Sequence, residues 1–206
     1  MSDVTDRLRC EILSGEFPPG TRLIELQLTE RYSVGRATIR ATIVELSAEG
    51  LVVHEANRGA TVRTVPIQVA IEIAQARAAL EGLQARQAAA RASEAERAEL
   101  QAIIRDMEAA VDENDHPAYS ELNGMLHRRI GQISGHSIGT ELVANLRNRG
   151  AHQEFRLALK PGRSSISLPQ HRAVVDGIVA GDGDAAEAAM RDHLASVESA
   201  LRDWMS

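Results

Sequence analysis

The sequence predicts a mainly α-helical protein in which short helices and a β-hairpin precede an all-α bundle of about six helices. Aromatic residues make up only 2% of the 206 residues, and this composition suits packed helices better than sheets. Helical periodicity runs through most of the chain after Pro66. Strand-like Val-rich runs occur only before it, between Leu51 and Val65.

Three short helices are expected in the first 50 residues. The first covers about Asp3 to Ser14, and the segment GEFPPG at 15–20 ends it because prolines and glycines cannot continue a helix. A second helix covers roughly Glu25 to Tyr32. A third runs from Arg36 to about Glu49, and Gly50 follows it as a C-terminal capping glycine.

The segment after the third helix favours a β-hairpin. Its two Val-rich runs are separated by Asn57-Arg58-Gly59, which suits a tight turn. Two helices joined by a tight break and followed by a hairpin are typical of winged helix-turn-helix geometry. We place a domain boundary at Pro66, so the sequence predicts two domains, residues 1–65 and residues 66–206.

The second domain is expected to be helical almost throughout. Ser93 and Glu96 have the spacing of a capping box, and Pro117 suits the first position of a helix. Turn residues and periodicity predict the bounds of four further helices. In chain order these helices cover Pro117 to about Ile133, Gly139 to Leu159, a segment beginning near Ser167-Leu168-Pro169, and Asp182 or Asp184 to Trp204.

Charge and cysteine content narrow the class of protein. The net charge of −6 argues against indiscriminate binding to nucleic acid, but residues 31–44 contain three arginines and no acid. The single cysteine, Cys10, cannot form an internal disulfide, which suits a reducing compartment. No signal peptide and no long apolar run are present. We therefore expect a cytoplasmic protein without a membrane partner.

Two arginines of the third helix have the spacing of a DNA reader. Arg36 and Arg40 are four residues apart and project from the side opposite the apolar face. Arginine binds guanine or phosphate in a bidentate manner. On any single helix such a pair more often only solvates an exposed face, but the hairpin directly downstream favours DNA binding.

The N-terminal region resembles the GntR superfamily of bacterial transcription regulators. The resemblance covers nearly all of residues 7–65, through PPGTRL, LTERYSVGRATIRATIVELSAEGLV and NRGATV. The family's recognition helix usually opens with SRTPVREAL, where this sequence has GRATIRATI, so Gly35, Thr38 and Ala41 depart from the pattern. The resemblance implies a DNA interface formed by the recognition helix and the wing tip, with Arg36, Thr38, Arg40, Arg58 and Gly59.

Histidines of the second domain suggest a metal site. Asn123 and His127 are four residues apart and share one face of a helix, while His171 and His193 belong to the last two helices. Spacing alone does not decide between a metal site and ordinary histidines, because most isolated histidines on helices are structural or surface residues.

Residues 77–204 resemble the FadR-type ligand-binding domain known as FCD. The resemblance rests on RAALEGL, LNGMLH, SLPQHRAVVDGI and GDAAEAAMRDHL. It implies that Asn123, His127, His171 and His193 hold a divalent metal, Zn²⁺ or Ni²⁺, whose open positions accept a carboxylate. Asn123 offers a neutral amide oxygen, a weaker ligand than a carboxylate.

Arg77 is the candidate partner for a small carboxylate effector. The resemblance places it toward the pocket, and a guanidinium suits an organic acid. An ordinary ion pair with Glu81, four residues later, is the equal alternative. His152, Arg156 and Arg163 are further candidates for lining the pocket.

These observations together predict an effector-responsive repressor that binds a palindromic operator as a homodimer and has no catalytic residues. A metal-dependent hydrolase using the three histidines is the alternative. We expect no carboxylate beside the histidines to act as a general base, which argues against the hydrolase. A constitutive architectural DNA-binding protein would leave the helical domain without a role.

Overall fold

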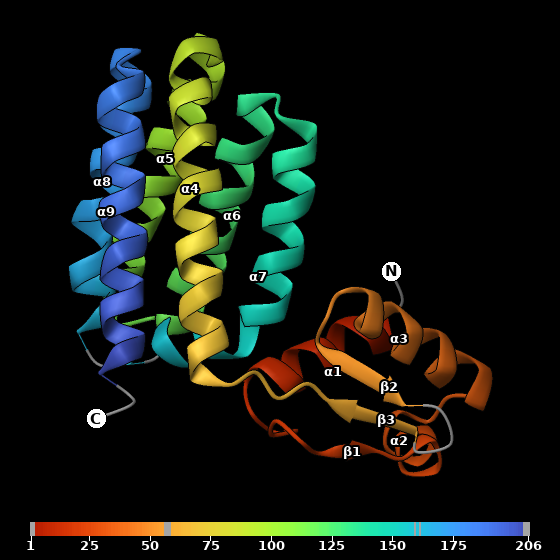
Figure 1. Cartoon of the computed structure of the whole chain (residues 1–206). Helices are drawn as coiled ribbons and strands as arrows, with labels where there is room; N and C mark the ends of the chain where they lie inside the picture. The colour runs from red at the N-terminus through yellow and green to blue at the C-terminus, as the bar shows by residue number, and fades with distance from the viewer. Residues whose placement is uncertain (1–2, 56–58, 159, 161, 204–206) are drawn as a thin grey trace. The chain divides into compact units, whose positions relative to one another are not determined.

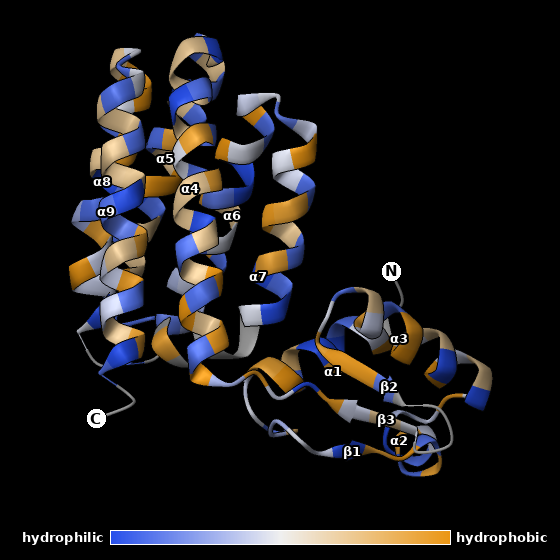
Figure 2. Cartoon of the chain, viewed as in Figure 1, coloured by the Kyte–Doolittle hydropathy of each residue, from blue (hydrophilic) through white to orange (hydrophobic). Residues whose placement is uncertain are grey.

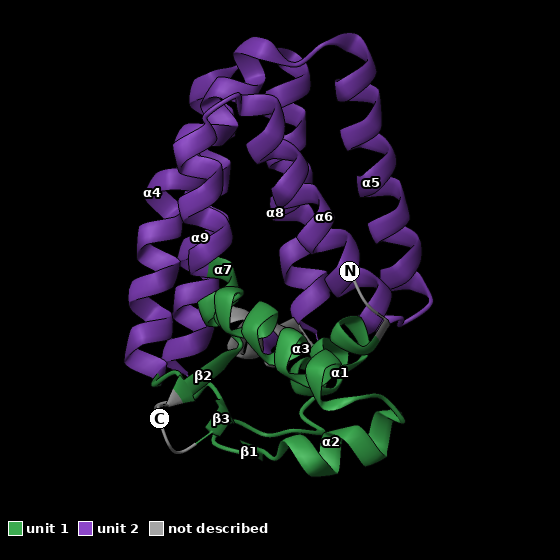
Figure 3. Cartoon of the chain, turned by 90° about the vertical axis from the view of Figure 1, so that its right-hand side faces the viewer, with its two compact units in different colours: residues 1–66, 147–156 green, residues 67–146, 157–206 purple. Residues whose placement is uncertain are grey.

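The computed structural model describes residues 3–55, 59–158, 160 and 162–203 (Figure 1). The chain divides into two compact units (Figure 3). Unit 1 contains Met1–Pro66 and Arg147–Arg156, and unit 2 contains Ile67–Leu146 and Leu157–Ser206.

Unit 1 has the winged helix-turn-helix fold that the sequence predicts. Its helices are α1 (Asp3–Leu13), α2 (Glu25–Tyr32) and α3 (Arg36–Ala48), and its strands are β1 (Arg22–Leu23), β2 (Val52–Glu55) and β3 (Gly59–Val62). The strands form an antiparallel sheet in the order β1-β3-β2. The sequence did not predict β1, because two residues show no periodicity.

The recognition helix α3 is fixed against α1. Leu8, Ile39 and Leu46 are fully buried in the core of unit 1. The guanidinium of Arg9 donates from Nε and Nη2 to the two carboxylate oxygens of Glu49, at 2.7 and 2.6 Å. Gly50 follows the helix with φ of 82°, a conformation that favours glycine. The expected end of the third helix is thus confirmed to within one residue.

Unit 2 is built from long helices. They are α4 (Ile67–Arg91), α5 (Glu94–Asp112), α6 (His116–Ser134), α7 (Ser137–Ala158, of which residues 147–156 belong to unit 1), α8 (Arg163–Ala180) and α9 (Gly183–Arg202). Helix α4 packs against α9, α6 and α8, and α5 packs against α6 and α8. Hydrophilic and hydrophobic residues are interspersed along these helices (Figure 2). No described helix is both long and apolar enough to cross a bilayer.

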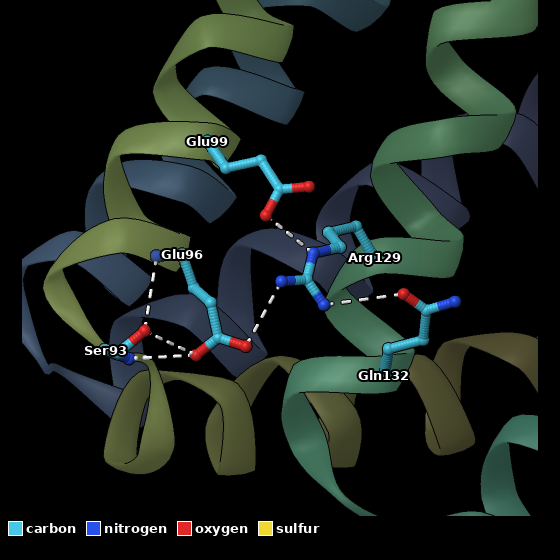
Figure 4. A network of polar contacts seen from close by, with 5 residues as sticks. All are labelled: Ser93, Glu96, Glu99, Arg129 and Gln132. Atoms are coloured by element: carbon cyan, nitrogen blue, oxygen red, sulfur yellow. Dashed lines mark hydrogen bonds and ion pairs between the residues drawn. The ribbon is translucent and has the colours of Figure 1, made fainter.

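The expected capping box at Ser93 is present and belongs to a network that joins α5 to α6. The Ser93 hydroxyl accepts from the backbone N–H of Glu96, whose carboxylate accepts from the backbone N–H of Ser93. Arg129 of α6 donates to Glu96 at 3.2 Å and to Glu99 at 2.8 Å (Figure 4). The network fixes the helix that carries Asn123 and His127.

Helix α8 begins earlier than the sequence predicts. The expected start near Ser167-Leu168-Pro169 is wrong, because α8 starts at Arg163 and contains Pro169 in its interior. A proline has no N–H for the carbonyl four residues before it, so such a helix needs other stabilisation. The first turns pack into the protein, since Arg163, Ser164 and Ser167 are all buried, and the Ser167 hydroxyl donates to the carbonyl oxygen of Arg163 at 2.7 Å.

Helices α8 and α9 approach closely beside the turn that joins them. A Cβ atom on Gly177 would lie 2.7 Å from the backbone nitrogen of Ala186, so the two backbones can meet only at a glycine. His171 lies six residues before Gly177, and His193 lies seven residues after Ala186. Both histidines are therefore about two helical turns from the contact.

Candidate metal centre and nucleic-acid interface

Three buried histidines from three helices converge in unit 2. His127 of α6, His171 of α8 and His193 of α9 each offer a ring nitrogen, and these atoms lie within 4.8 Å of one another. All three side chains are buried, with His171 only 1% exposed. The structure thus brings together three of the four residues that the resemblance implies as metal ligands.

Two of the imidazoles face each other through their Nε2 atoms. Nε2 of His171 lies 3.2 Å from Nε2 of His193. On the other side of the rings, Nδ1 of His171 lies 3.2 Å from the hydroxyl of Tyr119, and Nδ1 of His193 lies 3.1 Å from Oε1 of Gln170. The amide oxygen of Gln170 accepts from an Nδ1–H, which leaves Nε2 of His193 deprotonated and able to bind a metal.

The third imidazole is oriented by a carboxylate. Nδ1 of His127 lies 2.5 Å from Oε2 of Glu81, and Oε1 of Glu81 accepts from Nε of Arg77 at 2.5 Å. Both Arg77 and Glu81 are buried. Contact between a carboxylate and the outer nitrogen of a histidine is the usual support for a metal ligand, because it fixes the ring and raises its basicity.

Glu81 adds a contact that the sequence did not show. We expected no carboxylate beside the histidines to act as a general base, and the structure places the Glu81 carboxylate against Nδ1 of His127, where it also binds Arg77. The sequence showed Glu81 only as the neighbour of Arg77 on one helix face, and that ion pair is present. The contact with His127, 46 residues away, depends on how α4 packs against α6.

The electrostatics of the cluster favour a neutral imidazole at His193. Burial lowers the pKa of His193 well below 6.5, and the neighbouring His171 and His127 lower it further. A histidine binds a metal in its neutral form, so no proton has to be displaced from His193 at neutral pH.

Asn123 provides an independent test of whether a metal fits. It lies one turn before His127 on α6, and its Oδ1 atom is buried without a hydrogen-bond partner in the described part of the chain. A buried acceptor without a donor is unfavourable by about 1–3 kcal/mol. A metal ion would satisfy this oxygen together with the imidazoles, so the residues present fit a divalent cation.

In unit 1 the structure places the expected DNA-reading residues on α3 and the hairpin. Arg36 and Arg40 are exposed, Thr38 is half-buried, and Gly59 is exposed at the first position of β3 with φ of 85°. Arg58 lies outside the described residues. The exposed face of α3 carries no acidic side chain of its own along Arg36, Ala37, Arg40, Ala41 and Val44.

Ion pairs with acids elsewhere in unit 1 reduce the local positive charge that the sequence suggested. Nε of Arg40 lies 3.0 Å from Oε2 of Glu25 at the start of α2. Arg31 pairs with Glu11 and Glu16. The sequence missed these three contacts, since the acids lie outside the window 31–44.

A groove of about 710 Å³ lies beside the ion pair between Arg40 and Glu25. Residues of α3 and of all three strands line it, among them Arg22, Glu25, Arg40, His54 and Gly59. Four of these five carry a formal charge or a titratable ring. The groove therefore lies between the middle of the recognition helix and the ends of β2 and β3 next to the hairpin turn.

Comparison with known proteins identifies both parts of the chain. Residues 1–62 match the model of bacterial regulatory proteins of the gntR family, and residues 72–196 match the FCD domain. The chain belongs to the GntR family and carries an FCD domain. This family assignment makes the chain a DNA-binding transcription regulator and removes the hydrolase alternative.

Several regulators are similar to this GntR-family chain along most of their length. The HTH-type transcriptional repressor RspR of Escherichia coli is 26% identical, over 97% of this chain and 90% of that protein. The HTH-type transcriptional regulator LutR of Bacillus subtilis is 25% identical, over 94% and 97%. The solved structure of E. coli McbR/YncC covers 100% of both chains with a TM-score of 0.84 at 18% identity, which shows a shared fold.

Proposed function

We propose that this GntR-family regulator is a cytoplasmic repressor whose operator affinity is controlled by a small organic acid at a metal centre. The observation that carries the proposal is the convergence of three buried histidines beside an unpartnered amide oxygen, in a chain whose N-terminal region is a DNA-binding domain. We propose residues 1–65 as the DNA-binding domain and residues 66–206 as the effector domain.

The DNA-binding part of the proposal assigns Arg36, Thr38 and Arg40 to the major groove, and Arg58 and Gly59 to the wing. The exposure of Arg36 and Arg40 on one face of α3 supports it. Palindromic operators have half-sites about one helical turn apart and need two recognition helices, so we propose that the chain acts as a homodimer. Light scattering of the full chain at micromolar concentration tests this, and a monomer would contradict it.

The sensing part of the proposal assigns Asn123, His127, His171 and His193 as ligands of Zn²⁺ or Ni²⁺. When bound, such a metal supplies coordination positions that a carboxylate oxygen can occupy. The chain's own residues supply the rest. Glu81, Tyr119 and Gln170 orient the three imidazoles, and burial favours the neutral form of His193 by lowering its pKa.

Arg77 stays a candidate for binding the effector. Its Nε is bound to Glu81, so its role includes positioning the carboxylate that orients His127. A guanidinium has five N–H donors, so one contact to Glu81 does not exclude a second to an acid. The side chains of His152 and Arg156 lie outside the described residues.

The test measures operator binding with and without metal and acid. Fluorescence anisotropy on the upstream region of the chain's own gene would be recorded for metal-loaded and chelator-stripped protein, with a panel of small acids. We expect an acid to weaken operator binding about 5- to 150-fold, and only when metal is present. The variants His127→Ala and His171→Ala should bind the operator but ignore the acid. An equal response in these variants would contradict the proposed sensor.

A further inference from the structure

The exposed surface of the recognition helix α3 consists of arginines and methyl groups. Residues 36–43 repeat a pattern of four residues, RATIRATI. In each copy the isoleucine is buried, at Ile39 and Ile43, while the arginine and the alanine are exposed. Val44 lies one turn after Arg40 and continues this exposed surface. Every exposed residue of α3 is therefore an arginine, an alanine or a valine.

Val44 is an unusual residue for a surface. It is 67% exposed, more than any other large hydrophobic side chain in the described part of the chain. It lines the groove beside Arg40, and Ile24, which is 43% exposed, lines the same groove. Single exposed apolar side chains are ordinary, but two of them in one groove favour a surface that a partner covers.

The charges of the groove indicate what this partner is. The lining carries more positive than negative groups, with Arg22, Arg40 and the imidazole of His54 against the carboxylate of Glu25. The groove also lies in the domain that the family assignment makes a DNA-binding domain. The major groove of DNA has phosphates along its edges and thymine methyl groups on its floor, so DNA matches both the charges and the apolar residues.

The side chains exposed on α3 match some bases and not others. In the major groove, asparagine and glutamine bind adenine, and aspartate and glutamate bind cytosine. No exposed residue of α3 is of these four types. Arginine binds guanine, and small apolar side chains contact the C5 methyl group of thymine. The apolar residues of this surface therefore match thymine.

We propose that Ala41 and Val44 contact thymine methyl groups in each operator half-site, next to the bases or phosphates that Arg40 binds. This inference rests on the proposed function, because it requires α3 to read the operator. Ala41 and Val44 are three residues apart, which corresponds to about 4.5 Å of helix rise, against about 3.4 Å between successive bases of one strand. Each of the two side chains should therefore meet a different thymine.

The test uses the full chain and DNA duplexes that this chain selects from a random pool. Each thymine of the selected half-site is replaced in turn by deoxyuridine, which lacks only the C5 methyl group. Fluorescence anisotropy at one salt concentration gives the ratio of the affinities for the thymine duplex and the deoxyuridine duplex. We expect a ratio of about 3 to 5 at two thymines, as for the burial of one methyl group, and a ratio near 1 at the others.

The variants are Val44→Ala and Ala41→Gly, with Leu26→Ala as the matched control. Leu26 is 52% exposed on α2 and is not among the residues that line the groove. Val44→Ala should bring the ratio toward 1 at one thymine, and Ala41→Gly at the other, whereas Leu26→Ala should keep both ratios. Because each ratio compares two duplexes with the same protein, a general loss of affinity or folded protein cancels.

A ratio near 1 at every thymine in the parent, or ratios that neither variant changes, would overturn the inference. A change of oligomeric state in Val44→Ala with unchanged ratios would also overturn it, and would assign the apolar surface to a second copy of the chain. The variant Arg40→Ala separates such a failure from failure of the proposed function. If Arg40→Ala still weakens binding to the selected duplex, α3 reads the operator without thymine methyl groups and the proposed function stands.

Discussion

Oε2 of Glu81 lies 2.5 Å from Nδ1 of His127, and the other oxygen of the same carboxylate holds Arg77. One carboxylate of α4 thus connects a guanidinium of its own helix to an imidazole of α6. Because Nδ1 of His127 is engaged, coordination through Nε2 would keep this contact intact. Metal affinity should therefore depend on a residue that does not itself bind the metal.

We expect Glu81→Gln to lower the affinity for Zn²⁺ or Ni²⁺ about 10- to 100-fold, since an amide orients His127 less well and makes it less basic. Competition with a chromophoric chelator measures the change. Glu72→Gln, an exposed position on the same helix, is the matched control and should leave affinity unchanged. Equal affinities in parent and Glu81→Gln would mean that Glu81 only neutralises Arg77.

Asn123→Asp should increase the stabilisation that a metal provides. A carboxylate is a stronger ligand than an amide, but without metal it would be a partly buried charge next to the cluster. The melting temperature should thus fall for the chelator-stripped variant and rise for the metal-loaded one, relative to the parent. Asn123→Leu, which has no oxygen ligand, should show a smaller metal-induced shift than the parent. A metal-induced shift equal in all three proteins would exclude residue 123 as a ligand.

Arg40→Ala should weaken operator binding by about 1–3 kcal/mol without unfolding unit 1, because the side chain is 67% exposed and contributes little to the core. Anisotropy with operator DNA measures the loss, and circular dichroism checks the fold. Arg172→Ala, a loss of one exposed arginine from α8, serves as the charge control. An affinity within threefold of the parent would show that α3 does not read the operator through Arg40.

Glu25→Gln should raise operator affinity at low salt. Arg40 must leave Glu25 to reach DNA, and an exposed ion pair of this kind contributes about 0.2–1 kcal/mol. When Glu25→Gln is made in the parent chain, operator affinity should therefore rise about 1.5- to 5-fold. If Glu25→Gln raised operator affinity equally in an Arg40→Ala background, the gain would come from reduced repulsion of phosphate and not from release of Arg40.

The sequence predicted most of the fold because local patterns determine most of its elements. The capping box at Ser93, the glycine after α3 and the hairpin residues around Gly59 all act within a few positions. The start of α8 was missed because Ser167-Leu168-Pro169 has the pattern of a helix N-terminus, whereas the helix begins at Arg163, which is buried by tertiary contacts. Local patterns cannot report such packing.

The candidate site was only partly predictable for the same reason. Asn123 and His127 share a helix, so their spacing alone places them on one face. That His171 and His193 meet them was implied by family resemblance, not by spacing. The contacts of Glu81 with His127 and of Glu25 with Arg40 depend on the rotation of one helix against another. No periodicity in the sequence encodes that rotation.

The close approach of Gly177 to Ala186 has a genetic consequence. Any larger residue at position 177 would push α8 away from α9 and so separate His171 from His193, two turns away. Under the proposed function, a selection for mutants that stay repressed in the presence of inducer should therefore recover position 177 along with the histidines. Such alleles would keep every proposed metal ligand and every proposed DNA-contacting residue, and their phenotype would originate from the spacing between two helices.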